Sequence, residues 1–320
     1  MVHRQPIGES FWRWHHGTVA EFPDVEAVWR ESDTSSGATT GMDLRRRGPL
    51  RGPSARAYLV MMLGLYVLDQ DDAAWTKTFL DALGLVGFEQ KAARQALTRS
   101  AAGGWLTQIR DGRRVRWNLT PRGREFLRSA EARLFATGPE RDWDGDWLVL
   151  LTSVPEKHRM LRHALRTSLG WAGFGSLGAG VWISPHPSRA DEARQVLGSL
   201  GDQVQGTLLH SRLDDPADRQ RLAAQAWEVS ELDAHYRAFI DRFAAARPDT
   251  PGDTLAQQVH MFYEWRRLLL ADPGLPPTLL PPDWSGEHAR RLFLDRHAAW
   301  NRPAHTWWRA SETEIGTPHS

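Results

Sequence analysis

The sequence predicts an α+β multidomain protein, and three observations support this fold class. A helix-helix-turn-helix pattern over residues 54–102 precedes a short alternating hairpin. Residues 147–213 follow the order β-α-β, α-β, which suggests a ferredoxin-like domain, and from Pro216 onward the pattern is helical. We expect an extension and linker over 1–53, a winged helix-turn-helix over 54–138, a ferredoxin-like α/β domain over 139–215 and a helical C-terminal domain over 216–320.

The N-terminal extension is irregular in its sequence pattern, and residues 31–53 are typical of a linker. Its basic residues predict either an arm that contacts phosphates or a solvated basic linker: Arg45, Arg46, Arg47 and Arg51. Three predicted helices follow, over 54–68 with Ser54 as N-cap, over 76–85 and over 89–102.

The third of these helices has two unlike faces. Small, mostly apolar side chains occupy one face: Ala93, Ala96, Leu97 and Ser100. The opposite face carries Lys91, Arg94, Gln95 and Thr98, which are residue types that hydrogen-bond base edges and phosphates. A solvated polar face would explain the stripe alone, so the segment that follows it decides between the two interpretations.

That segment is predicted to be a basic wing. Residues 105–110 and 113–119 alternate around an Asp111-Gly112 turn, and Thr120-Pro121 begins a closing helix. The resulting winged helix predicts DNA recognition, although a minority of such modules bind protein instead. We expect Arg94, Gln95 and Thr98 to reach bases, and the remaining cations to hold phosphates: Lys91, Arg99, Arg110, Arg113, Arg114 and Arg116.

The charge distribution agrees with a DNA-binding region. Residues 89–128 contain ten Lys or Arg residues and three acids, a net +7 in a chain whose total is +1. A local basic field on an otherwise slightly acidic body suits phosphate contacts without indiscriminate binding. The chain has no cysteine, no export signal and no apolar run longer than the eleven residues 58–68, so we expect a cytoplasmic protein that is not in the membrane.

The remaining predicted elements are strands over 147–154, 180–184 and 204–213 and helices over 156–169, 190–200, 218–246, 254–271 and 286–300. An ordered set of short motifs extends over 54–300: Ser54-Ala-Arg56, Ala93-Arg-Gln-Ala-Leu-Thr-Arg99, Gly104-Trp-Leu106, Trp143-Asp-Gly-Asp-Trp147, Gly173-Phe-Gly175, Gly180-Val-Trp182, Tyr236-Arg-Ala-Phe239, Arg242-Phe243, Glu264-Trp-Arg-Arg267, Asp272-Pro273 and Leu279-Leu-Pro-Pro-Asp-Trp284. Together these motifs resemble the PaaX family, bacterial regulators typified by the repressor of phenylacetic acid catabolism.

The resemblance implies a homodimer formed by the ferredoxin-like domain, which leaves its double-stranded operator when an aryl-coenzyme A thioester such as phenylacetyl-coenzyme A binds. Such an effector needs an apolar slot for its ring and cations for its phosphates. We predict that these come from Trp182, Tyr236, Arg237, Trp265, Arg266 and Arg267. Core packing of the aromatic side chains and a salt bridge made by the arginines are the alternatives.

Two alternatives to a regulator that binds DNA are a metal-dependent nuclease and a protein-interaction scaffold. A nuclease needs a carboxylate near the end of the first strand, but the strand over 147–154 has only Asp144 and Asp146 before it and Glu156 after it. His260 and Glu264, one helical turn apart, could hold one metal ion or belong to an ion-paired face. We expect no enzyme activity, no catalytic residues, no metal and no cofactor.

Overall fold

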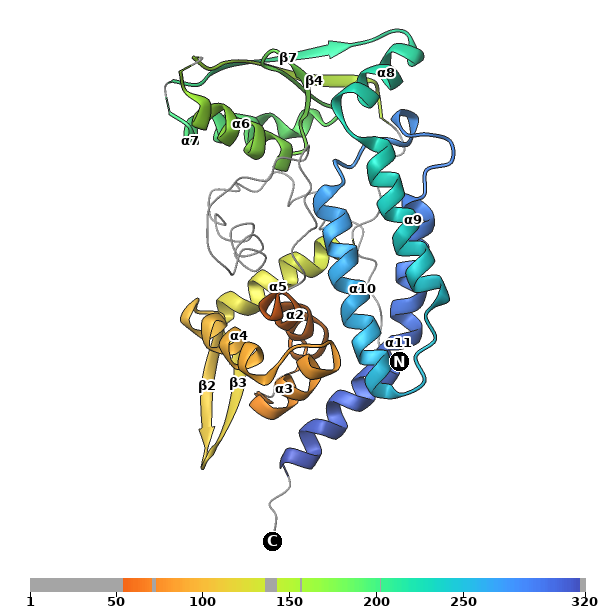
Figure 1. Ribbon diagram of the computed structural model, residues 1–320. Coiled ribbons are helices and arrows are strands. Elements are labelled where there is room, and N and C mark those ends of the chain that lie inside the picture. Colours follow the sequence, from red (N-terminus) through yellow and green to blue (C-terminus); the bar gives the residue numbers. More distant parts are fainter. Residues whose placement is uncertain (1–53, 71–72, 136–142, 156, 202, 317–320) are drawn as a thin grey trace, which may run out of the picture.

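The computed structural model describes residues 54–70, 73–135, 143–155, 157–201 and 203–316 (Figure 1). The predictions for the extension, including its four arginines, lie outside these residues. The described chain is a mixed α and β structure with two antiparallel sheets. Within the described ranges, no helix is long and apolar enough to cross a membrane.

Helices open the described chain: α2 (Ala55–Met62), a π-helical turn (Leu63–Val67), α3 (Thr76–Leu85) and α4 (Gln90–Ala102). Ser54 caps α2 as predicted, because its hydroxyl oxygen accepts a hydrogen bond from the Ala57 amide at 3.2 Å. The first predicted helix is therefore present, but its last turn is π-helical rather than α-helical.

The first sheet has the order β1-β3-β2, with β1 (Ala74–Trp75), β2 (Leu106–Asp111) and β3 (Arg114–Leu119). Asp111 pairs with Arg114, so the two-residue turn is Gly112-Arg113, one residue later than predicted. Gly112 has a φ of 59°, the left-handed conformation that such a turn requires. The sequence did not predict β1, since two residues are too few to show alternation. α5 (Pro121–Leu134) follows, and the Thr120 hydroxyl caps it by accepting from the Gly123 amide at 3.0 Å.

The second sheet has the order β5-β6-β4-β7, from β4 (Asp146–Ser153), β5 (Gly175–Gly178), β6 (Val181–Ser184) and β7 (Gln205–Arg212). α6 (Arg159–Trp171) and α7 (Ala190–Ser199) cover one face, where Leu150 and Leu169 are buried between sheet and helices. The other face packs Trp147 and Ile183 against α8 (Pro216–Ala226) and the short helix η4 (Pro277–Leu279). The sequence missed β5, whose glycines obscure any alternation, and Glu156 lies outside the described residues.

Two predicted helices in the C-terminal part were wrong in their extent. The helix expected over 218–246 is interrupted, and α9 (Val229–Ala245) begins anew after α8. Trp227 causes the break, because its backbone is extended and its ring packs 6.4 Å from that of Trp147. The last helix, α11 (Gly286–Gly316), continues beyond 300 and past Pro303, since Ala304 and Trp308 extend its buried face.

The two ends of the described chain share one hydrophobic core. α10 (Pro251–Ala271) contacts both α2 and α11, and side chains of α2–α5 and α9–α11 belong to a single buried cluster. Trp308 of α11 stacks on Tyr66 at 5.0 Å between centroids and meets Phe79 of α3 edge-on at 5.3 Å. In Figure 1 the second sheet lies at the top, and α2–α5 pack beside the column formed by α9, α10 and α11. The domain boundaries at 138 and 216 stay predictions.

A buried polar chain crosses this core. The Tyr66 hydroxyl donates to Gln258 Oε1 at 2.7 Å, and Gln258 Nε2 lies 3.2 Å from His297 Nδ1. Gln258 is fully buried, so each of these bonds satisfies a group that would otherwise be left unpaired at a cost of about 1–3 kcal/mol. The chain fixes the π-helical turn, α10 and α11 in one register.

The variant Phe293→Ala tests the shared core. Phe293 of α11 is fully buried and stacks on Trp265, so its truncation should lower the free energy of unfolding by about 3–5 kcal/mol in urea titrations. Hydrogen exchange should show amides of α2 and α11 losing protection together. Arg291→Ala, exposed on the same helix, is the control and should stay within about 0.5 kcal/mol. Unaltered protection of α2 in Phe293→Ala would contradict a common core.

Candidate nucleic-acid interface

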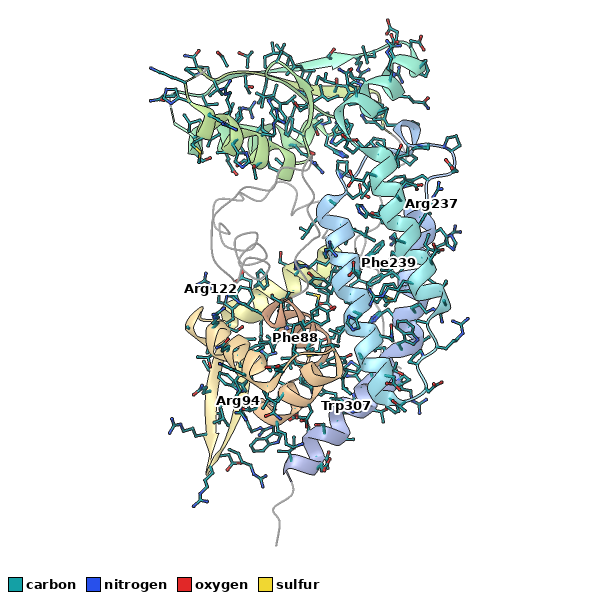
Figure 2. All side chains as sticks on the ribbon, viewed as in Figure 1. Phe88, Arg94, Arg122, Arg237, Phe239 and Trp307 are labelled. Atoms are coloured by element: carbon teal, nitrogen blue, oxygen red, sulfur yellow. The ribbon has the colours of Figure 1, made fainter. Side chains whose placement is uncertain are left out.

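α4 presents one exposed face and one buried face. The exposed residues line a surface hollow of about 530 Å³: Lys91, Arg94, Gln95, Thr98 and Arg99. The buried residues are the predicted ones: Ala93, Ala96, Leu97 and Ser100. The Thr98 hydroxyl donates to the Arg94 carbonyl at 3.0 Å, which leaves its oxygen free to accept. Figure 2 shows Arg94 on α4 beside the β2–β3 hairpin.

The hairpin adds two exposed cations to this side. Arg110 is near the end of β2 and Arg113 is in the turn, and neither guanidinium group forms a hydrogen bond or ion pair with another described residue. An exposed guanidinium on a projecting hairpin can reach a phosphate without first giving up an internal partner. Lys91, Arg94, Arg110 and Arg113 therefore form a cationic surface around α4.

The structure places the other two wing arginines elsewhere. Arg116 donates from Nε to the Ala73 carbonyl at 2.9 Å, and its guanidinium lies 4.9 Å from the Trp75 ring centroid. Arg114 donates to the carbonyl of Ile315 at the end of α11 and also lies over Trp75. The structure thus brings this pair to β1 and α11, although the sequence predicted phosphate contacts for both.

Sequence reasoning missed a further contact at the base of the hairpin. The Glu312 carboxylate of α11 accepts a hydrogen bond from the Trp75 amide, with distances of 3.0 and 3.3 Å to its two oxygens. Only tertiary structure can show this contact, because 237 residues separate the partners. It attaches β1, and through β1 the hairpin, to the last helix.

A polar cluster joins α2 to α10. The Tyr58 hydroxyl lies 2.6 Å from His260 Nδ1, and its ring packs 4.9 Å from that of Tyr263. Burial raises the pKa of Tyr58, so the hydroxyl that hydrogen-bonds with the histidine keeps its proton. Glu264 forms ion pairs with Arg242 and Arg267, which accounts for His260 and Glu264 without a metal ion. Among the described residues, no group of three or more His, Asp or Glu could hold a metal ion.

The predicted effector residues do not gather around one pocket. Tyr236 and Trp265 are buried with ring centroids 6.2 Å apart, and Trp265 Nε1 donates to the Leu134 carbonyl. Arg266 is also buried, with its guanidinium 5.6 Å from the Tyr263 ring. Their present environment is a packed core.

The other effector residues lie apart from these three. Trp182 belongs to the core of the second sheet, where its Nε1 donates to Thr152 Oγ1 at 3.2 Å. Arg267 pairs with Glu264, and Arg237 of α9 pairs with Asp233 at 2.7 Å and Asp283 at 3.1 Å (Figure 2). A role in effector binding stays a prediction for all six residues.

Asp272 forms the joint between the second sheet and the helical column. Its half-buried carboxylate accepts hydrogen bonds from the Tyr236 hydroxyl at 2.6 Å and from the Gly274 amide at 2.7 Å. Burial raises the pKa of Asp272, and these two bonds and nearby Arg189 oppose that shift. Arg189, which precedes α7, donates to the Pro273 and Ala172 carbonyls. The Arg189 guanidinium occupies the space that a Cβ at Gly173 would need, which explains the glycine of that motif.

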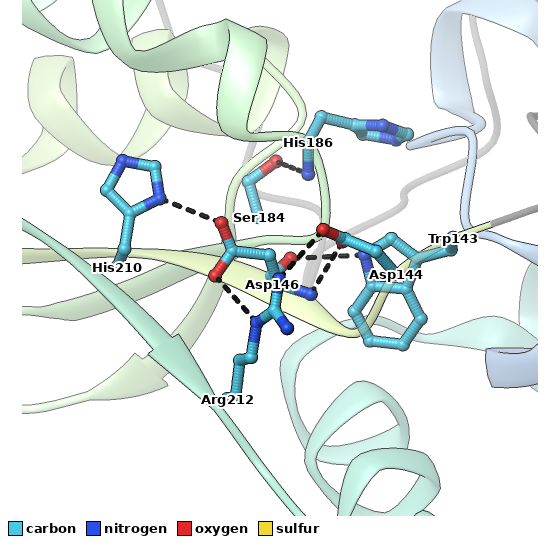
Figure 3. Close-up of polar contacts among 7 residues, drawn as sticks. All are labelled: Trp143, Asp144, Asp146, Ser184, His186, His210 and Arg212. Carbon is cyan, nitrogen blue, oxygen red and sulfur yellow. Dashed lines mark hydrogen bonds and ion pairs between the residues drawn. The ribbon is translucent and has the colours of Figure 1, made fainter.

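The acids before β4 form surface ion pairs (Figure 3). Asp144 pairs with Arg212 at 2.9 Å, and Asp146 lies 3.0 Å from His210 Nδ1 on the neighbouring strand. Asp146 is the first residue of β4 rather than a residue before it. Both carboxylates therefore lie at the opposite end of the strand from the position that a nuclease would use.

Comparison with known proteins decides the family. The transcriptional repressor PaaX of Escherichia coli (strain K12) is 30% identical over 232 residues, covering 69% of this chain and 72% of that protein. Three family descriptions match successive segments: PaaX-like protein over 54–123, PaaX protein central Cas2-like domain over 140–223 and PaaX-like protein C-terminal domain over 227–310. The chain belongs to the PaaX family.

Membership in the PaaX family confirms the resemblance predicted from the motifs, and the relative is a regulator rather than an enzyme. A solved structure of an uncharacterized protein from Mycobacterium tuberculosis is also similar, with a TM-score of 0.56 and 26% identity. The match covers 79% of this chain and 98% of that one. The arrangement of elements is thus shared with a solved structure over most of the chain.

The polar cluster that joins α2 to α10 should make the free energy of unfolding depend on pH. Burial and the nearby charge of Arg242 lower the pKa of His260 to about 4, and burial also lowers the pKa of His297 and of His305. Because the unfolded pKa is about 6.5, the unfolded chain binds protons between about pH 6.5 and 4 that the folded chain does not. The free energy of unfolding should therefore fall as the pH decreases through this window.

Urea titrations at about pH 7.5 and about pH 5 measure this loss. His260→Gln should show a smaller loss than the parent chain, because glutamine has no proton to gain. His288→Gln, at an exposed histidine of α11, is the control and should keep the parent's pH dependence. An equal loss in His260→Gln and in the parent would assign the effect to other groups.

Proposed function

We propose that this PaaX-family protein is a DNA-binding transcriptional repressor that reads its operator with a winged helix-turn-helix. In this proposal α2–α4 and the β2–β3 hairpin form the module, with α4 as recognition helix. One observation carries it: α4 is anchored by small buried side chains and exposes Lys91, Arg94, Gln95, Thr98 and Arg99 beside a hairpin with free arginines. Such side chains match base edges and phosphates, and the related Escherichia coli protein is named a repressor.

We further propose that the chain acts as a homodimer. The order β4-α6-β5-β6-α7-β7, with the sheet order β5-β6-β4-β7, supports the proposal of a ferredoxin-like domain, and this domain would form the dimer. Two-fold symmetry would then pair two α4 helices on half-sites about one helical turn, or a multiple of it, apart.

An aryl-coenzyme A thioester, such as phenylacetyl-coenzyme A, is the proposed effector. Tyr236 and Trp265 are packed in the present structure, so a ligand ring between them would have to favour another arrangement of α9 and α10. α10 packs on α2, which in turn packs on α4. A shift of α10 would therefore change how α4 meets DNA.

Arg94→Ala tests the reading face. It should reduce affinity for the operator by about 1–3 kcal/mol and relax specificity at one base position, as measured by gel-shift titration. Arg302→Ala, exposed on α11, is the control and should bind like the parent. Unchanged operator affinity in Arg94→Ala would refute the assigned face, and a protein-interaction scaffold would show no salt-sensitive DNA affinity at all.

Thermal-shift titration with phenylacetyl-coenzyme A tests the effector. At a concentration of about 100 times Kd, a ligand of the folded state stabilises it by about 2.7 kcal/mol, so the midpoint should rise. The same ligand should release labelled operator, and Arg237→Ala should need more ligand for both effects. Coenzyme A alone is the control for the aryl group. No shift with any aryl thioester would reject the effector and leave the DNA-binding proposal standing.

A further inference from the structure

A second cationic surface lies far from α4 along the chain, on α6 of the second sheet. Lys157 precedes this helix, and Arg159, Arg162 and Arg166 are exposed on it. The helix itself contains no acidic residue. Its apolar side chains Leu165 and Leu169 are buried against the sheet, so the packing of α6 holds the basic face toward solvent.

The arginines of this face differ from other exposed arginines near the second sheet. Arg194 pairs with Asp191, Arg212 with Asp144 and Arg221 with Asp218, each within 3 Å. By contrast, the guanidinium group of neither Arg159 nor Arg166 forms an ion pair or hydrogen bond with another described residue. Two uncompensated guanidinium groups on one helix face create a local positive field that attracts anions.

We propose that this face of α6 is a second DNA-contact surface, which binds backbone phosphates outside the bases read by α4. The proposal rests on the DNA-binding function proposed above. Arg159 and Arg166 lie seven residues apart, two turns along one side of the helix, or about 10 Å. Phosphates follow one another every 3.4 Å or so along the axis for each strand, so the pair would span about three base-pair steps.

The shape of the face favours DNA over the phosphates of a small molecule. A coenzyme A ligand needs a slot that buries most of its surface, whereas these side chains project from the outer side of a helix. Figure 1 also shows α6 and the β2–β3 hairpin on the same side of the α10 column, with α9 on the other side. A duplex held by α4 and extending along that side would meet the basic face.

The test compares Arg159→Ala/Arg166→Ala with the parent chain on labelled duplexes of about 15 and about 45 base pairs. The double variant should bind the short duplex like the parent and the long duplex more weakly. Its slope of log affinity against log salt on the long duplex should be smaller by about 2 for each protomer whose α6 contacts the duplex, since each phosphate contact contributes about 0.9. Arg159→Lys/Arg166→Lys should keep the parent's slope, because the charge is retained.

Arg291→Ala/Arg302→Ala, at two exposed arginines of α11, is the matched control and should leave both duplexes unaffected. Parental affinity and slope of Arg159→Ala/Arg166→Ala on the long duplex would overturn the proposal. If Arg159→Ala/Arg166→Ala lost coenzyme A binding but kept the parent's DNA binding, the face would be a small-molecule site and the proposal would be overturned. A parent chain that binds neither duplex with salt-sensitive affinity would instead refute the proposed function itself.

Discussion

The burial of α10 between α2 and α11 is the contact on which the rest of the structure depends. Gln258 on this helix hydrogen-bonds with both Tyr66 and His297, and His260 hydrogen-bonds with the Tyr58 hydroxyl. The proposed reading helix α4 packs on α2 and α3, which themselves belong to this core, so its position depends on the core. A change at α10 would therefore change the support of α4, and in the proposed function this couples an effector to DNA binding without direct contact between the two.

The second sheet is attached to this core in a different way. Its link combines the apolar cluster of Trp147 and Ile183, against which Val229 of α9 packs, with a polar joint at Asp272. The Asp272 carboxylate accepts hydrogen bonds from Tyr236 and Gly274 and lies near Arg189. A carboxylate withdrawn from water is tolerated only while its partners are in place, so the polar joint is directional and specific. Apolar packing depends less on angle than hydrogen bonds do, so these hydrogen bonds fix the orientation of the sheet.

Periodicity is enough to predict much of the candidate site. The 100° step of a helix separates the buried Ala93, Ala96 and Leu97 from the exposed Arg94, and alternation locates the hairpin. Elements without a pattern of their own were missed, such as β1 and β5, because their residues become strands only when β3 and β6 pair with them. The end of one long predicted helix at Trp227 likewise depends on a partner ring from the distant strand β4.

The sequence by itself determined which residues alternate, which helix faces are apolar and where positive charge is concentrated, because these properties depend on neighbours a few positions apart. Tertiary structure decided which hydrogen-bond partners each arginine side chain has. The guanidinium groups of Arg110 and Arg113 bond to no other described residue, whereas those of Arg114 and Arg116, in the same hairpin, donate to the carbonyls of Ile315 and Ala73. Local pattern assigns a side chain to a face, but only the fold of the whole chain brings α11 to that face.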